Sequence, residues 1–242
     1  MIHPQLVKIP FTLFFQPQEF NDKFTLSSRL RSAANSVAGN IFDGEALILP
    51  VPQNGPPDVP RIQLESRDKG HVLQIALHRM NLEWNQRAQQ TEGWTCALAD
   101  FFRLIESLLR VFAGEYVKPV RFALNPQFLH QMQSSANEYL AGQVIQAGRV
   151  SDCPAACKIG LLDQMNLNGR MVNLWMNISS ARQQNNPQDD RGLIIHFDYN
   201  SAAEETRPYS TDEIVALLGE AEGLMNERIQ AFFKDLFSPA AS

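Results

Sequence analysis

Residues 61–85 read RIQLESRDKGHVLQIALHRMNLEWN, and this stretch decides the fold class. Apolar and polar residues alternate in three short runs, with the period of two that is typical of β-strands. The three runs are 61–67, 72–77 and 80–84. Asp68-Lys69-Gly70 has the composition of a tight turn, and His78-Arg79 separates the second run from the third. The stretch therefore predicts an antiparallel meander.

A long amphipathic helix is predicted directly after the meander. Between residues 94 and 112, apolar side chains recur at steps of three and four, which places them on one face of a helix. They are Trp94, Leu98, Phe101, Phe102, Ile105, Leu108, Leu109 and Phe112. Gly114 stands where a helix C-terminus is expected. Because a sheet face needs a second layer to cover it, meander and helix together predict an α+β protein.

The first strand of the chain is predicted over residues 7–15, and a helix follows it and ends near Gly39. Pro10 lies inside this strand and has no N–H to donate to a neighbouring strand. The sequence therefore places this strand at an edge of the sheet.

The order of elements recurs in the second half of the chain. Strands are expected at 117–124, 158–162, 171–178 and 193–199. A short helix is expected from Ala136, and a second long apolar stripe runs over 211–236. We therefore predict two similar units, 1–115 and 116–242, each an antiparallel sheet covered by a long amphipathic helix. The repeated order suggests an internal duplication.

Composition excludes several classes of protein. Of the 242 residues, 44% are hydrophobic and 19% are charged, which is typical of globular proteins rather than disordered chains. The net charge of −5 disfavours a nucleic-acid or anionic-membrane surface. No apolar run approaches the ~18 residues that a membrane-spanning helix needs. The three cysteines are too few for a disulfide framework, so we expect a cytoplasmic protein.

The meander and the C-terminal strand Leu193-Ile194-Ile195-His196-Phe197-Asp198-Tyr199 carry a resemblance. The chain resembles a sporadically distributed family of uncharacterised bacterial proteins of similar length, most closely over 61–113 and 193–237. The resemblance agrees with the predicted fold. It implies no activity and no catalytic residue, because the family's function is unknown.

The cysteine pair Cys153 and Cys157 is one candidate for chemistry. Two thiolates bind zinc when two further ligands join them, and His130 and His196 are the nearest histidines in the sequence. Three residues between the cysteines is an unusual spacing both for zinc sites and for redox thiols. We therefore expect idle thiols, no metal and no cofactor.

Two polar pairs are the other candidates. His196 and Asp198 share one face of a predicted strand, where a carboxylate orients an imidazole for general-base catalysis. The alternative is an ordinary polar face whose reverse side carries Ile195 and Phe197. His78 and Arg79 lie at a predicted turn, and loops often bind ligands.

The sequence contains no motif that names a reaction. Our leading hypothesis is a non-enzymatic binding or protein-interaction protein. It would use a cleft between the units or an exposed strand edge such as the Pro10 strand. Its partner would be an unknown protein or a second copy of the chain. The alternative is an enzyme, for example a hydrolase, with a dispersed active site around His196 and Asp198. A nucleic-acid binder is the third and least favoured class.

Overall fold

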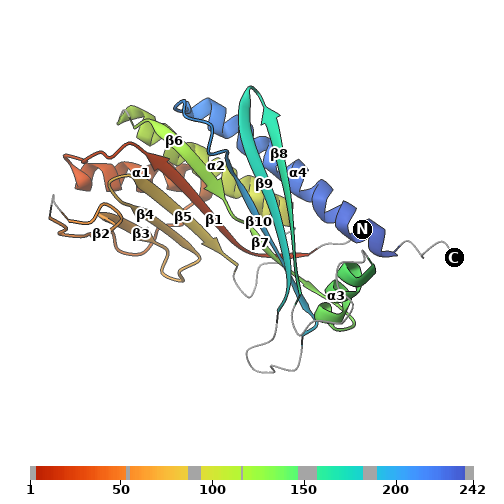
Figure 1. Cartoon of the computed structure of the whole chain (residues 1–242). Coiled ribbons are helices and arrows are strands. Elements are labelled where there is room, and N and C mark those ends of the chain that lie inside the picture. Colours follow the sequence, from red (N-terminus) through yellow and green to blue (C-terminus); the bar gives the residue numbers. More distant parts are fainter. Residues whose placement is uncertain are drawn as a thin grey trace.

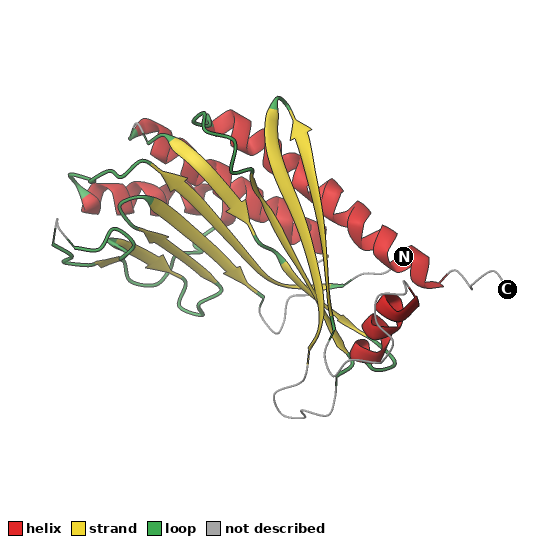
Figure 2. Ribbon diagram, viewed as in Figure 1, coloured by secondary structure: helices red, strands yellow, loops and turns green. Residues whose placement is uncertain are grey.

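The structure is a computed structural model that describes residues 4–52, 55–86, 94–115, 117–146, 157–181 and 190–237. Within them, ten strands form one antiparallel sheet, accompanied by four helices (Figures 1 and 2). The strands are β1 (Gln5–Phe15), β2 (Leu47–Ile48), β3 (Ile62–Glu65), β4 (His71–Ile75), β5 (Arg79–Asn85), β6 (Pro119–Leu124), β7 (Gln127–Gln131), β8 (Lys158–Leu167), β9 (Arg170–Ala181) and β10 (Gly192–Ser201). The helices are α1 (Lys23–Ala38), α2 (Trp94–Gly114), α3 (Ala136–Gln146) and α4 (Thr211–Phe237). The predicted α+β class is confirmed.

The strands that the sequence assigned to two sheets join in one. Their order is β2-β3-β4-β5-β1-β6-β10-β9-β8, and β7 pairs with both β1 and β10. The predicted boundary at residue 115 falls between α2 and β6, and β6 pairs with β1 across it, with Leu13 opposite Phe122. A continuous sheet therefore takes the place of the expected cleft between two units.

The strand order reads the same way outward from the central β1–β6 pair. One side continues through β5, β4 and β3, and the other through β10, β9 and β8. In the first half of the chain the last strand is β5, and the long helix α2 follows it. In the second half the last strand is β10, and the long helix α4 follows it. The two halves of the chain therefore have matching positions in the sheet.

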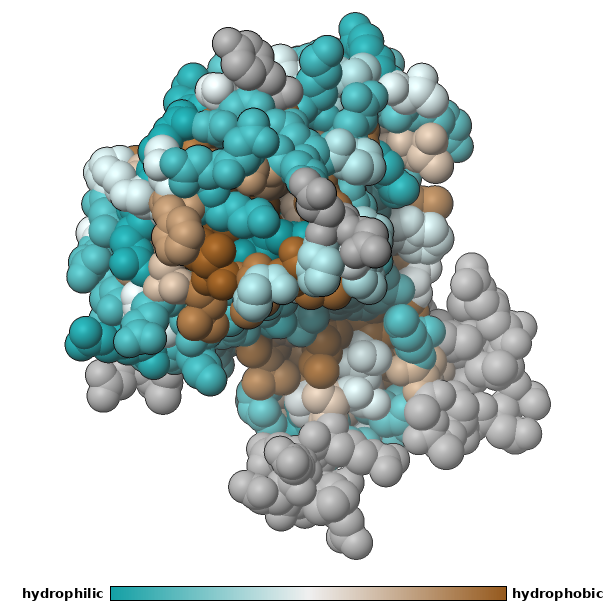
Figure 3. Space-filling view, turned by 90° about the vertical axis from the view of Figure 1, so that its left-hand side faces the viewer, coloured by the Kyte–Doolittle hydropathy of each residue, from teal (hydrophilic) through white to brown (hydrophobic). Residues whose placement is uncertain are grey.

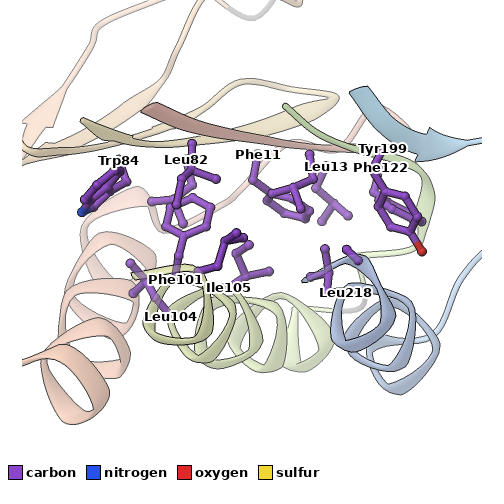
Figure 4. Close-up of a cluster of buried hydrophobic side chains, with 14 of the residues drawn as sticks. Phe11, Leu13, Leu82, Trp84, Phe101, Leu104, Ile105, Phe122, Tyr199 and Leu218 are labelled. Atoms are coloured by element: carbon purple, nitrogen blue, oxygen red, sulfur yellow. The ribbon is translucent and has the colours of Figure 1, made fainter. Parts of the chain in front are cut away.

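Helices α1, α2 and α4 lie on one side of the sheet, and the core fills the space between. Figure 4 shows α1, α2 and α4 below the strands, with side chains of both layers pointing toward each other. Phe11 from β1, Leu82 from β5, Ile105 from α2 and Leu218 from α4 are at most 1% exposed. Hydrophobic residues form a band across the end of the molecule where α1 and β2 lie (Figure 3). Such a band is expected where the core between the helices and the sheet reaches the surface.

The prediction that Pro10 marks an edge strand is wrong, because β1 lies in the middle of the sheet. β1 pairs with β5 on one side and with β6 and β7 on the other. The carbonyl of Pro10 accepts a hydrogen bond from the N–H of Asn125, so its nitrogen also points to that side. Asn125 and Pro126 separate β6 from β7 there. Pro10 therefore has its nitrogen, which carries no hydrogen, directed at the gap between β6 and β7. No regular hydrogen bond between strands is lost there.

The β8–β9 hairpin is longer than the sequence predicted. It turns at Asn168 and Gly169, which both have positive φ, at 53° and 76°. Two residues with positive φ are typical of the tight hairpin turn that matches the twist of the strands. Ten consecutive residue pairs join the two strands, so this hairpin forms one side of the sheet.

Capping residues fix the starts of the helices in the second half. The Glu213 N–H donates to Ser210 Oγ at 3.1 Å, and Ser210 N–H donates to the Glu213 carboxylate at 2.8 Å. Ser135 Oγ accepts from the Glu138 N–H at 3.1 Å, so both helix starts have the bond from the Glu N–H to the Ser hydroxyl that is typical of a capping box. None of the described helices combines the length and the apolar character that crossing a membrane demands.

Candidate functional site

The candidate site is the face of the sheet that points away from the helices, which we call the open face. Strand side chains alternate between the two faces. In β10, for example, Ile195, Phe197 and Tyr199 are buried in the core, whereas His196 and Asp198 point to the open face and are half-buried. Helices α1, α2 and α4 lie on the other side and leave this face uncovered (Figure 4).

A row of side-chain amides crosses the open face. Residues directly opposite one another on successive strands form the sequence Gln63, Gln74, Asn81, Thr12, Ala123, Asn200, Asn173 and Gln164. We call this set the amide row. It runs through β3, β4, β5, β1, β6, β10, β9 and β8, and six of its eight members are Asn or Gln. At about 4.8 Å between neighbouring strands, the row is roughly 34 Å long.

The two halves of the amide row match about its centre. Thr12 of β1 and Ala123 of β6 lie at the middle, and each side then continues with an asparagine, Asn81 or Asn200. The next positions are again amides on both sides. These are Gln74 and Gln63 on one side and Asn173 and Gln164 on the other. The matching strand order therefore extends to matching side-chain chemistry.

Hydrogen bonds link the amides into two chains that each end on a carboxylate. On one side, Gln164 donates to Asn173 at 3.3 Å, and Asn173 donates to Asn200 at 3.3 Å. Asn200 then donates to Asp198 at 2.7 Å. On the other side, Gln74 donates to Gln63 at 3.0 Å, and Gln63 donates to Glu65 at 3.4 Å.

These chains use only part of the hydrogen-bonding capacity of the row. A side-chain amide has two N–H donors and an oxygen with two lone pairs, so each linked amide keeps a donor and an acceptor site. A ligand on the open face would therefore meet donors and acceptors at regular intervals. The amides that face it are already oriented by their neighbours.

Carboxylates and one aromatic ring lie beside the row. Two positions from the row, Glu83 of β5 and Asp198 of β10 occupy matching places on the two sides. Lys8 pairs with Glu83 at 2.7 Å. Trp175 lies directly opposite Asp198, and its side chain is 38% exposed, whereas Trp84 and Trp94 are 7% exposed. The open face therefore offers one accessible indole.

His196 and Asp198 lie on the same face, as the sequence predicted. Burial lowers the pKa of His196, and the nearby Asp198 carboxylate opposes that effect. Asp198 accepts its hydrogen bond from Asn200 rather than from the imidazole. Among the described residues, no serine, threonine or cysteine side chain is hydrogen-bonded to His196. The structure thus brings the pair together but adds no activated nucleophile to it.

His78 and Arg79 hold the proline-rich loop against the meander. His78 Nδ1 lies 3.2 Å from the carbonyl oxygen of Pro57, and its Nε2 lies 3.1 Å from the Asp58 carboxylate. Arg79 approaches the same carboxylate at 3.6 Å. These contacts give the pair a structural role, and the prediction that it binds a ligand stays untested.

Among the described residues, the proposed zinc ligands are not brought together. His196 points to the open face, whereas His130 lies opposite the buried Leu193 and so points to the helix side. Cys157 is half-buried and packs against the core on that side, and Cys153 lies outside the described residues. In the described ranges no three His, Cys, Asp or Glu residues form a group that could hold a metal ion.

An apolar hollow of about 300 Å³ lies at one end of the open face. Val7, Leu129, Ile194 and Ala181 line it, together with the amides of Gln127 and Gln131. His196 is two residues from Ile194 on the same face. The open face therefore changes from polar at the amide row to apolar at this end.

The sequence did not reveal the amide row. Its members lie between residues 12 and 200, and only the pairing of strands places them in line. The sequence held no clear signal, because Asn and Gln are no more frequent than Lys and Glu in the predicted strands. No family of known proteins matches the chain, and neither does any curated protein. The resemblance to uncharacterised bacterial proteins therefore stays a prediction.

Proposed function

We propose that this protein is a non-enzymatic binding protein that holds its ligand on the open face, along the amide row. The observation that carries the proposal is the row itself, which places side-chain amide donors and acceptors on six of the eight strands that it crosses. Binding sites usually combine a largely preformed surface with a few fixed polar groups. The central part of a sheet with a packed core behind it supplies such a surface.

The matching halves support a second part of the proposal, that the chain arose by internal duplication. Both the strand order and the amide positions match about the β1–β6 pair. A duplicated unit that binds one stretch of an extended ligand would, once fused to its copy, bind a stretch twice as long. The fused protein would then need both halves of the row for tight binding.

The experiment uses protein purified from its own host, so that the natural ligand is present. Native mass spectrometry would compare wild type with Asn81→Ala/Asn200→Ala and with the control Asn226→Ala, an exposed amide on α4. We expect a bound species in wild type and in the control, and its loss from the double variant. Carbene footprinting of the wild type should show protection on the open face. Protection on the helix side alone, or equal binding by all three proteins, would contradict the proposal.

A second copy of the chain is the other partner that the sequence suggested. Native mass spectrometry of the same samples reports it directly. A dimer that survives in the Asn81→Ala/Asn200→Ala variant would show that self-association does not use the amide row.

An enzyme with His196 as general base is the second candidate. The observation that favours it is the lowered pKa of His196, which keeps the imidazole neutral and able to accept a proton near pH 7. The test is hydrolysis of a panel of activated esters and phosphoesters by wild type and His196→Ala. Turnover that the substitution abolishes would support catalysis. Equal background rates would reject it without affecting the binding proposal.

A further inference from the structure

We propose that the ligand of the open face is an unbranched, neutral polysaccharide chain that lies along the amide row. This inference rests on the proposed function and names the class of ligand. It follows from the charge of the row, from its regular spacing, and from the aromatic ring and carboxylates beside it.

The row itself carries no charge. Its members are Asn, Gln, Thr and Ala, each of which is neutral at every physiological pH. A ligand with many hydroxyl groups suits such a surface, because each hydroxyl both donates and accepts. The carboxylates of Glu83 and Asp198 add strong acceptors for hydroxyl groups on the two sides of the centre.

Charge gives no reason to expect a polyanion on the open face. Nucleic-acid affinity depends on cations that neutralise phosphates, and the chain has a net charge of −5. Two arginines, Arg79 and Arg121, do lie on the open face on either side of Phe14. Arg79 is already near the Asp58 carboxylate, at 3.6 Å. The carboxylates of Glu83 and Asp198 lie as near to the amide row as Arg79 and Arg121 do on its other side, so the charges beside the row do not favour an anionic chain over a neutral one.

An extended peptide fits the row less well than a glycan does. Peptides commonly add to the edge of a sheet, where backbone groups are unpaired, and the row crosses the face instead. Protein interfaces also depend on central apolar or aromatic anchors. The centre of the row holds Thr12 and Ala123, which supply no such anchor.

Trp175 supplies the remaining part of a glycan site. Its half-exposed ring is on the open face, opposite Asp198 and beside the exposed Leu162 of β8. An indole is a large, rigid ring with an apolar face, and it can pack against the C–H face of a sugar ring. Asn173, two residues away on the same face of β9, would then reach the hydroxyls of the same or the next sugar.

The test measures binding of three neutral hexasaccharides, cellohexaose, xylohexaose and chitohexaose, by calorimetry and by tryptophan fluorescence. We expect at least one to bind and to change the emission of wild type. Because Trp84 and Trp94 are buried, the change should disappear in Trp175→Phe. Asn81→Ala/Asn200→Ala should weaken binding at least about tenfold, the effect of losing one or two hydrogen bonds. The control Asn226→Ala should bind as wild type does.

A second variant guards against loss of structure. Ala123→Arg removes no amide but places a long side chain at the centre of the row, and it should also abolish binding. Heparin hexasaccharide, poly(dT) and an unstructured peptide are the competing probes. One outcome is that the substitutions in the row abolish the binding of one of these probes, while no neutral hexasaccharide binds. That result overturns the glycan inference and leaves the proposed function standing. If none of the probes and no host-derived ligand depends on the row, both proposals fail.

Discussion

Replacing Arg170 should destabilise the protein more than replacing a charged residue on its surface. The Arg170 side chain is 2% exposed and lies where the β8–β9 hairpin meets the start of α4. The guanidinium contacts Glu205 and Glu213, each at 2.9 Å, and lies 4.2 Å from the centre of the Tyr209 ring. It also donates to the carbonyl oxygens of Arg207 at 2.9 Å and Pro208 at 2.6 Å.

The magnitude follows from what remains after the substitution. In Arg170→Met, two carbonyl oxygens and the largely buried Glu205 lose their donor together. Removing one partner of a buried ion pair typically costs about 3–5 kcal/mol. Glu213 is 36% exposed and regains water, so we place the loss near the lower end, at about 3 kcal/mol. Arg170→Lys keeps the charge but loses the forked contacts, and its loss should be intermediate.

The assay is urea unfolding followed by circular dichroism, with the free energy of unfolding extrapolated to water. The matched control is Arg228→Met, which removes an ion pair to Asp163 at 2.8 Å. Because Arg228 is 44% exposed, its loss should cost at most about 1 kcal/mol. The reasoning is refuted if Arg170→Met lies within about 1 kcal/mol of wild type, or if the control is equally destabilised.

Three further predictions concern protonation, the core and the hairpin turn. The hydrogen bond from Arg170 lowers the pKa of Glu213 to about 2, so wild type should lose stability as the pH falls from about 4.5 to about 2. Arg170→Met should lose much of this dependence in acid-unfolding curves. Tyr199→Phe removes a bond from the hydroxyl to the carbonyl of Leu217 at 2.9 Å, and should cost about 1–2 kcal/mol in urea unfolding. Gly169→Ala introduces a Cβ at φ +76° and should lower stability by about 1 kcal/mol, whereas an unchanged unfolding midpoint would contradict a strained turn.

The parts of the fold that depend on local pattern could be predicted from the sequence. Alternation predicted the meander 61–85, and the apolar stripe predicted the helix 94–112. Each of these patterns is formed by residues that lie close together in the sequence. The capping boxes at Ser135 and Ser210 were recognisable for the same reason. β7 was missed because Gln127–Gln131 is short and its alternation is weak, with Phe128 as its one fully buried apolar residue.

The placement of Pro10 shows why topology was harder to predict. A proline in a strand usually indicates an edge, and that rule holds when the neighbouring strand is continuous. In this sheet the neighbouring strand is divided by Asn125 and Pro126, which are more than 100 residues away in the sequence. Arg170 was overlooked for a related reason, since its partners Glu205 and Glu213 reach it only through the packing of α4.

The chemistry of the open face is more specific than the fold requires. A sheet with one face in the core needs polar residues on the other face, and Lys, Glu, Ser or Thr would serve as well as Asn or Gln. Under the proposed duplication, matching positions began as identical residues and have since diverged. At equivalent positions next to the row the residues now differ widely: Val72 occupies the position equivalent to Trp175, and Phe14 the position equivalent to Arg121.

Within the row the divergence is much smaller. Asn81 matches Asn200, and Gln63 matches Gln164, while Gln74 matches Asn173, which preserves the amide. Stability alone does not explain this contrast, because the flanking positions contribute equally to strand pairing. Retention of amides along one line, with carboxylates kept at Glu83 and Asp198 beside it, is what a shared ligand contact would produce. The row is therefore the place where substitutions should affect binding before they affect folding.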